Sequence, residues 1–207
     1  MFLKMNWMWI LLFGSLIGLN EALIGSFAMP YRSSIVNAIS LAMLVFARLK
    51  LPRPGVSTLI VLIAVLFKFN NYHCYSCPFS VQLNAPLAML FMGISFELAA
   101  SLFMSSKNLR LQNLALSCIL TIFLAFGIFG IMNTYVTGHW GADKLIEHLL
   151  VKATLAAVFS SAIVITVYSL KIRVKLENES VRNKYLINGL LGVVIVALWI
   201  VGSLATF

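Results

Sequence analysis

Charged side chains are scarce in this sequence. Lysine, arginine, aspartate and glutamate make up 10% of its 207 residues, whereas soluble domains contain roughly a quarter. A water-soluble domain of this length exposes a large surface that so few charges cannot cover. Hydrophobic residues make up 61% and the mean hydropathy is +0.99, which also excludes a disordered chain. The composition predicts an all-α, polytopic transmembrane helical bundle in a lipid bilayer.

Signatures of catalysis and of nucleic-acid binding are missing as well. The sequence contains no Walker phosphate-binding motif, no Gly-x-Ser-x-Gly motif and no His-Glu-x-x-His motif. We therefore expect no enzymatic activity, and the sequence indicates no particular cofactor. The formal net charge is +9, but no basic stretch is interleaved with aromatic residues. Nucleic acid is therefore not an expected partner.

Seven apolar stretches are candidate membrane spans, and six to seven of them are expected to cross; the second and third are shorter than the roughly 20 apolar residues that a crossing helix needs. The seven stretches are Trp7–Phe27, Ser33–Leu49, Val56–Phe69, Leu83–Met104, Leu111–Met132, Leu149–Leu170 and Tyr185–Phe207. One membrane domain over residues 1–207 is expected, with a six-span body (1–170) and an additional C-terminal span (185–207). The charged segment between these two parts is the clearest break in composition. Asn70–Gln82 and Thr134–Glu147 are expected to be irregular.

The basic residues are distributed unequally between the two sides of these spans. Eleven of the fifteen lysines and arginines fall on the side that carries the N-terminus. The other four are Arg32, Lys68, Lys144 and Lys152. Because basic residues concentrate in cytoplasmic loops, the N-terminus is predicted inside and the C-terminus outside. The expected location is the cytoplasmic (inner) membrane.

Small residues recur every four positions in the first span, at Gly14, Gly18 and Ala22. Such a stripe lets the backbones of two membrane helices approach closely. Two interpretations remain open at this point. The stripe docks a separate membrane subunit, or it packs against another helix of the same chain.

Glu21 is an acidic residue within an apolar span, and such a residue normally has a partner or faces a cavity. Arg32 is the nearest basic candidate, so a structural ion pair is one interpretation. The other is a substrate-binding pocket that opens to the outside and is lined by Asn20, Glu21, Arg32, Asn84 and His73.

Glu97 and Lys68 are further ionisable residues within the spans. Glu97 is expected to hold a neighbouring helix, and a coupling role is the alternative. Lys68 ends the third span, and we expect its ammonium group to extend outward to the membrane surface.

The predicted outer loops collect histidine and cysteine. The sequence predicts a metal site from His73, Cys74, Cys77, His139 and His148, because thiolate and imidazole are ligands of zinc. A disulfide between Cys74 and Cys77 is the competing interpretation in an oxidising compartment. Redox-active thiols are the third.

Two segments resemble a known family. They are Arg53-Pro54-Gly55-Val56-Ser57-Thr58-Leu59 through Lys68, and Pro86-Leu87-Ala88-Met89-Leu90 through Phe96-Glu97-Leu98. Together with the small-residue stripe, they resemble the substrate-binding (S) components of energy-coupling factor vitamin transporters, of the hydroxymethylpyrimidine/thiamine type. The resemblance covers about half the chain.

The resemblance implies a six-helix protein with a small-molecule pocket near the outer surface. It implies that a coupling subunit docks on Gly14, Gly18 and Ala22, and that two ATPase subunits drive uptake. The seventh span and the His/Cys-rich loops depart from that pattern. Two other functions fit the sequence: a non-catalytic membrane subunit of a larger respiratory or photosynthetic assembly, and an outer-face metal or thiol-redox membrane protein.

Overall fold

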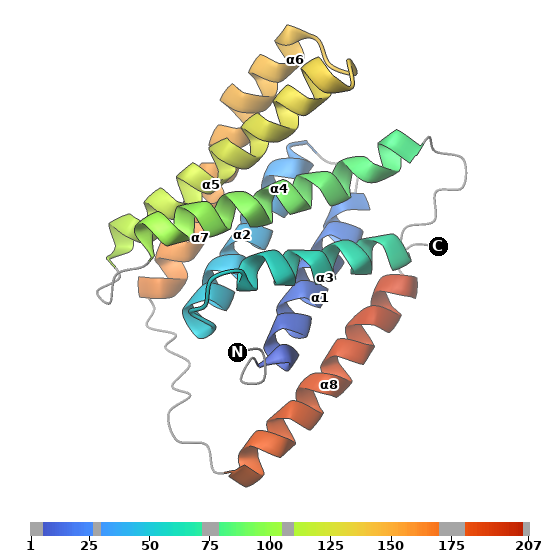
Figure 1. The fold of residues 1–207 in the computed structure, drawn as a ribbon, viewed down its shortest axis with the longest axis vertical. Helices are drawn as coiled ribbons and strands as arrows, with labels where there is room; N and C mark the ends of the chain where they lie inside the picture. The colour runs from blue at the N-terminus through green and yellow to red at the C-terminus, as the bar shows by residue number, and fades with distance from the viewer. Residues whose placement is uncertain (1–5, 27–29, 72–78, 105–109, 170–180, 205–207) are drawn as a thin grey trace.

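All elements that the structure describes are helical (Figure 1). The computed structural model describes residues 6–26, 30–71, 79–104, 110–169 and 181–204. The α-helices are α1 (Trp7–Leu23), α2 (Arg32–Lys50), α3 (Val56–Asn71), α4 (Phe79–Phe103), α5 (Leu111–Ile131), α6 (Ala142–Glu147), α7 (Thr154–Ser169) and α8 (Val181–Leu204). Three short segments extend or join them: the 3-10 turn η2 (Ile24–Ser26) and the π-helical turns η3 (Met132–Val136) and η4 (His148–Ala153). The predicted all-α class is confirmed for these residues.

Four of the described helical stretches are long and apolar enough to cross a membrane. They are Arg32–Lys50, Leu83–Phe103, Leu111–Val136 and Ala142–Thr166. Three shorter apolar stretches accompany them: Trp7–Leu23, Val56–Asn70 and Gly189–Gly202. Helices suit this environment because every backbone polar group is bonded within its own segment.

The expectation of an irregular segment over Thr134–Glu147 is wrong except for residues 137–141, which lie outside the helical elements. Helical structure continues through Val136 and resumes at Ala142. The wide π turn of η3 makes this possible, because the Thr137 N–H donates to the carbonyl of Met132 at 3.0 Å. The carbonyl of Asn133 then accepts from the N–H groups that follow the turn. Helical backbone hydrogen bonding therefore continues beyond the last apolar residues of α5 into the polar residues that follow.

Successive long helices run in alternating directions, so their ends gather at two opposite ends of the bundle (Figure 1). Trp9, in the first turn of α1, lies against Lys50, in the last turn of α2. We name this the Trp9 end and the opposite one the Glu21 end. α1 packs against α3, α8 and α2, and α5 packs against α4 and α7.

The glycines of α1 face α3. A Cβ atom added at Gly14 would lie 2.5 Å from the Cβ of Ile63, and one added at Gly18 would lie 2.6 Å from the Cβ of Phe67. Ala22, one turn further on, is buried. The surface predicted to dock a separate subunit is therefore occupied by a helix of the same chain. These contacts favour the interpretation that the stripe packs against another helix of the same chain.

Enlarging these glycines should destabilise the bundle. We expect Gly14→Ala and Gly18→Ala each to cost about 1–3 kcal/mol of folding free energy, because the backbones of α1 and α3 must separate. Gly127→Ala is the matched control, since a Cβ there meets nothing within 4 Å. Thermal unfolding of the detergent-solubilised protein measures the effect. Equal unfolding temperatures for Gly14→Ala and Gly127→Ala would contradict the close packing.

Candidate functional site

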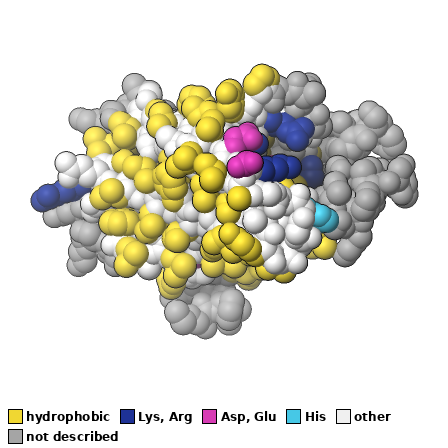
Figure 2. Space-filling view, turned by 90° about the horizontal axis from the view of Figure 1, so that it is seen from above, with side chains coloured by type: hydrophobic (Ala, Val, Ile, Leu, Met, Phe, Trp, Pro, Cys, Tyr) yellow, Lys and Arg dark blue, Asp and Glu magenta, His cyan; other side chains and the backbone are white. Residues whose placement is uncertain are grey.

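Three ionisable side chains come together at the Glu21 end of the bundle. Glu21 near the end of α1 interacts electrostatically with Lys68 near the end of α3 and with Arg32 at the start of α2. We call these three residues the Glu21 cluster. Figure 2, which views the molecule from above Figure 1, shows a broad hydrophobic surface on which acidic side chains lie next to basic ones, with further basic side chains at its far edge.

Lys68 is the member of the cluster that sequence analysis placed wrongly. The predicted outward extension of its ammonium group is incorrect, because the residue is only 8% exposed. The parallel packing of α1 and α3 brings Glu21 close enough for a Coulomb interaction with Lys68.

Gly25 makes room for the carboxylate of Glu21. A Cβ atom at Gly25 would lie 3.0 Å from Oε1 of Glu21, so the acidic side chain runs along its own helix toward the next turn. The sequence places Glu21 and Gly25 on the same face, since residues four apart are neighbours on a helix. The absence of a side chain at Gly25 therefore leaves space for the Glu21 carboxylate in this orientation.

Asn20 is turned toward α2. Its amide Nδ2 donates to the carbonyl of Val36 at 2.9 Å and to Oγ of Ser40 at 2.8 Å. The side chain therefore holds α1 against α2, which differs from the predicted role in lining the pocket. Of the other residues predicted to bind substrate, Glu21 and Arg32 lie in the cluster and Asn84 is partly buried on α4. His73 lies outside the described residues.

His148 is enclosed by aromatic rings between α5 and η4. Its ring centroid lies 4.6 Å from that of Phe126, 4.7 Å from that of Trp140 and 5.9 Å from that of Phe129. His139 in the preceding turn is exposed. In the part of the chain that the structure describes, no group of three or more His, Cys, Asp or Glu is placed to hold a metal ion.

The remaining residues of the predicted metal site are His73, Cys74 and Cys77. All three lie outside the described residues, as does the predicted disulfide between the two cysteines. The metal, disulfide and redox interpretations of that loop stay predictions.

Glu97 joins three helices near the Trp9 end, as predicted for a carboxylate that holds a neighbouring helix. Its Oε1 accepts a hydrogen bond from the backbone N–H of Ser57 at 2.8 Å, and its Oε2 lies 3.6 Å from Nη1 of Arg48. Arg48 also donates to the carbonyl of Arg53. The carboxylate thus satisfies a backbone donor of the first turn of α3, where helices have unpaired N–H groups.

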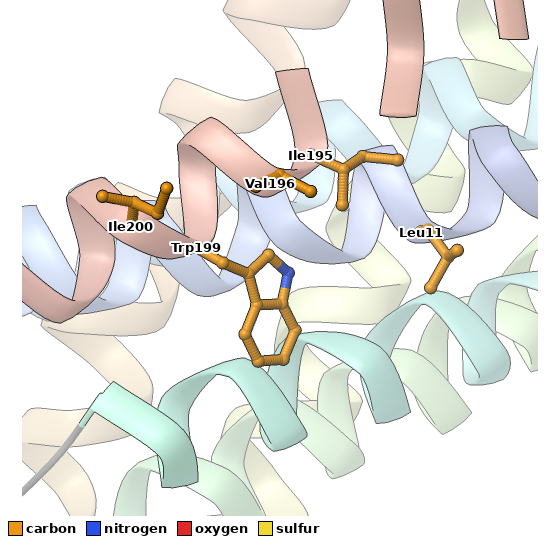
Figure 3. Close-up of a pocket in the computed structure, with 5 residues that line it drawn as sticks. All are labelled: Leu11, Ile195, Val196, Trp199 and Ile200. Atoms are coloured by element: carbon orange, nitrogen blue, oxygen red, sulfur yellow. The ribbon is translucent and has the colours of Figure 1, made fainter. Parts of the chain in front are cut away.

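α8 packs on the outside of α1 and α3. The indole Nε1 of Trp199 donates to Oγ of Ser15 at 2.9 Å, and its ring meets that of Phe67 at 4.9 Å. An open groove of about 480 Å³ lies beside this contact (Figure 3). It is lined by Leu11, Ile195, Val196, Trp199 and Ile200. A lining so apolar does not suit a polar substrate, so the groove is not part of the candidate site.

Comparisons of the chain with protein-family models, curated proteins and solved structures find no match.

The burial of Lys68 could have been anticipated from one signal in the sequence. Glu21 and Lys68 are single charges of opposite sign in two apolar stretches that, by the predicted topology, end on the same side of the membrane. Oppositely charged residues inside a membrane tend to pair. What sequence could not supply is that α1 and α3 are neighbours.

The cluster predicts a specific pattern of stabilities. Lys68→Met should destabilise the protein by about 3–5 kcal/mol, because it leaves a carboxylate without its buried partner. Glu21→Gln combined with Lys68→Met should recover most of that loss, since both charges are then gone. Lys144→Met, at an exposed position, controls for the general effect of removing a lysine. Additive losses in the double variant, measured by thermal unfolding, would rule out the pairing.

Proposed function

We propose that the protein crosses the cytoplasmic membrane seven times, with its N-terminus inside. Support comes from the alternating helix directions, which gather Arg48, Lys50, Arg53 and Arg110 at the Trp9 end. The excess of basic residues at that end marks the cytoplasmic side of membrane proteins. The Glu21 end then faces outward.

Cysteine labelling in whole cells tests this orientation. In a background with the native cysteines replaced by serine, Gly141→Cys should react with a membrane-impermeant maleimide, because it lies in an exposed turn at the Glu21 end. Pro52→Cys, in the exposed turn between α2 and α3, should react only after permeabilisation. The reverse pattern would overturn the proposed topology.

We further propose that the protein is a non-catalytic substrate-capture subunit that takes up a small polar molecule of the cofactor-precursor type. The observation that carries this proposal is the Glu21 cluster, a set of three ionisable groups in an apolar bundle. Ionisable residues within membrane segments are costly and commonly mark substrate or ion pathways. In the proposed orientation the cluster lies on the outer side, where a substrate for uptake arrives.

The chemistry of the cluster suits recognition rather than reaction. Arg32 is exposed, and a guanidinium group presents a planar set of donors to carboxylate or phosphate groups. Glu21 supplies acceptor oxygens for an N–H or O–H group, and Lys68 supplies further donors. Together they offer complementary partners to a ligand with both donors and acceptors.

Energy for uptake would come from partner subunits, since the sequence has no Walker motif. The proposed partners are a membrane coupling subunit and ATPases, as the resemblance to S components implies. The glycine stripe of α1 is not proposed as their docking surface, because α3 covers it.

Ligand retention tests the proposed function directly. Protein purified from its native host in mild detergent should carry a small molecule that mass spectrometry detects after denaturation. Arg32→Gln should lower its occupancy by about tenfold or more, because a charge-assisted hydrogen bond is lost. Lys144→Gln, also exposed, should leave occupancy unchanged.

Two results would contradict this proposal. One is the absence of any retained small molecule together with the absence of co-purifying ATPase or coupling subunits. The other is equal occupancy in wild type and Arg32→Gln. Co-purification with a large assembly that lacks ATPases would instead favour a non-catalytic subunit of such an assembly.

A further inference from the structure

The backbone at the start of α2 decides where Arg32, the exposed member of the Glu21 cluster, is placed. Arg32 is the first residue of α2, and Tyr31 precedes it with a φ of 54°. A left-handed backbone is unfavourable for a bulky residue, and among the described residues other than glycine only Tyr31 adopts a positive φ. Such strain persists where the surrounding structure holds it, and it clusters at ligand-binding sites. The chain is therefore held in a defined conformation directly before Arg32.

A hydrogen bond to another helix supplies part of this hold. The side chain of Tyr31 makes no capping hydrogen bond to the first turn of α2. Ser34, two residues after Arg32, is fully buried, and its hydroxyl donates to the carbonyl of Lys152 at 2.8 Å. Lys152 belongs to η4, and α2 packs against both η4 and α7. The bond thus ties the first turn of α2 to a neighbouring element that is remote in sequence.

The acceptor carbonyl belongs to an unusual turn. η4 is π-helical, a rare form that frequently occurs at functional sites. His148, the first residue of this turn, packs against the rings of Phe126 on α5 and of Trp140. The carbonyl of Lys152 therefore comes from a turn that is itself packed against α5. Through Ser34, α2 is connected to that packed turn.

We propose that Ser34 is a positioning residue for the Glu21 cluster. Its hydrogen bond to Lys152 orders the first turn of α2, so that the guanidinium group of Arg32 is held where it meets the anionic group of the ligand. Such preorganisation strengthens binding, because less conformational freedom is lost when the ligand arrives. The inference rests on the proposed function, in which Arg32 contacts the ligand, and it adds a residue that acts through Arg32.

Electron paramagnetic resonance tests the ordering of α2 without any ligand. In a background with the native cysteines replaced by serine, a nitroxide label is attached at Arg32→Cys. Ser34→Ala, which hardly changes the packing volume, should raise the mobility of this label, because the first turn of α2 loses its bond to η4. A label at Pro52→Cys, beyond the other end of α2, should be unaffected. Ser33→Ala removes the neighbouring hydroxyl and should leave both labels unchanged.

Ligand retention then tests the consequence for binding. In protein purified from the native host, Ser34→Ala should lower the occupancy of the retained small molecule by about fivefold, which corresponds to one typical hydrogen bond. In an Arg32→Gln background, the same substitution should have no further effect, since Ser34 acts through Arg32. Ser33→Ala should keep wild-type occupancy. Thermal unfolding of each variant confirms that it is folded.

Three results would overturn the positioning role. They are unchanged mobility of the label at residue 32 in Ser34→Ala, equal gains in mobility at residues 32 and 52, and additive losses of occupancy for Ser34→Ala and Arg32→Gln. Equal gains are the result expected if Ser34 only stabilises the bundle. A rise in mobility at residue 32 alone, in a protein that retains no small molecule, would instead overturn the proposed function and leave the ordering of α2 by Ser34 intact.

Discussion

The close approach of α1 and α3 is the constraint on which the rest of the structure depends. Gly14 and Gly18 leave no side chain between the two backbones, so Ile63 and Phe67 lie directly against α1. Because membrane helices gain little from the hydrophobic effect, such intimate packing is a main source of their association. In this contact the two helices are parallel, so their C-terminal ends lie side by side. It therefore decides which polar residues meet at the Glu21 end.

Polar interactions then complete the arrangement around this pair of helices. Asn20 hydrogen-bonds α1 to α2, and Trp199 hydrogen-bonds α8 to Ser15 of α1. Glu97 of α4 contacts both α2 and α3. Each of these groups is used between helices, where a hydrogen bond has little competition from water. The two carboxylates thus have different kinds of partner. Glu97 accepts a hydrogen bond from the N-terminus of a helix and pairs with an arginine, whereas Glu21 lies near two basic residues, Lys68 and Arg32.

The sequence predicted the class of fold and the role of Glu97, because long apolar runs and an isolated carboxylate have few alternatives in a membrane. It could not decide which surface Gly14 and Gly18 meet, since the same spacing serves packing within a chain and between chains. It misplaced Lys68 because burial of a lysine depends on a partner from a helix remote in sequence. It also ended the α5 segment too early, because polar residues such as Asn133 continue the helix through a π turn. The packing of aromatic rings around His148 could not be predicted, because nothing in the sequence shows which aromatic residues lie next to it.

The α1–α3 contact places Glu21 beside Lys68. A hydrophobic carbodiimide, which couples a carboxylate to an adjacent amine within a membrane, tests it in the reconstituted protein. Peptide mass spectrometry should find a direct link between Glu21 and Lys68. The Glu147–Lys152 pair, 3.2 Å apart, provides the internal positive control. A link at the control pair without one between Glu21 and Lys68 would contradict the arrangement.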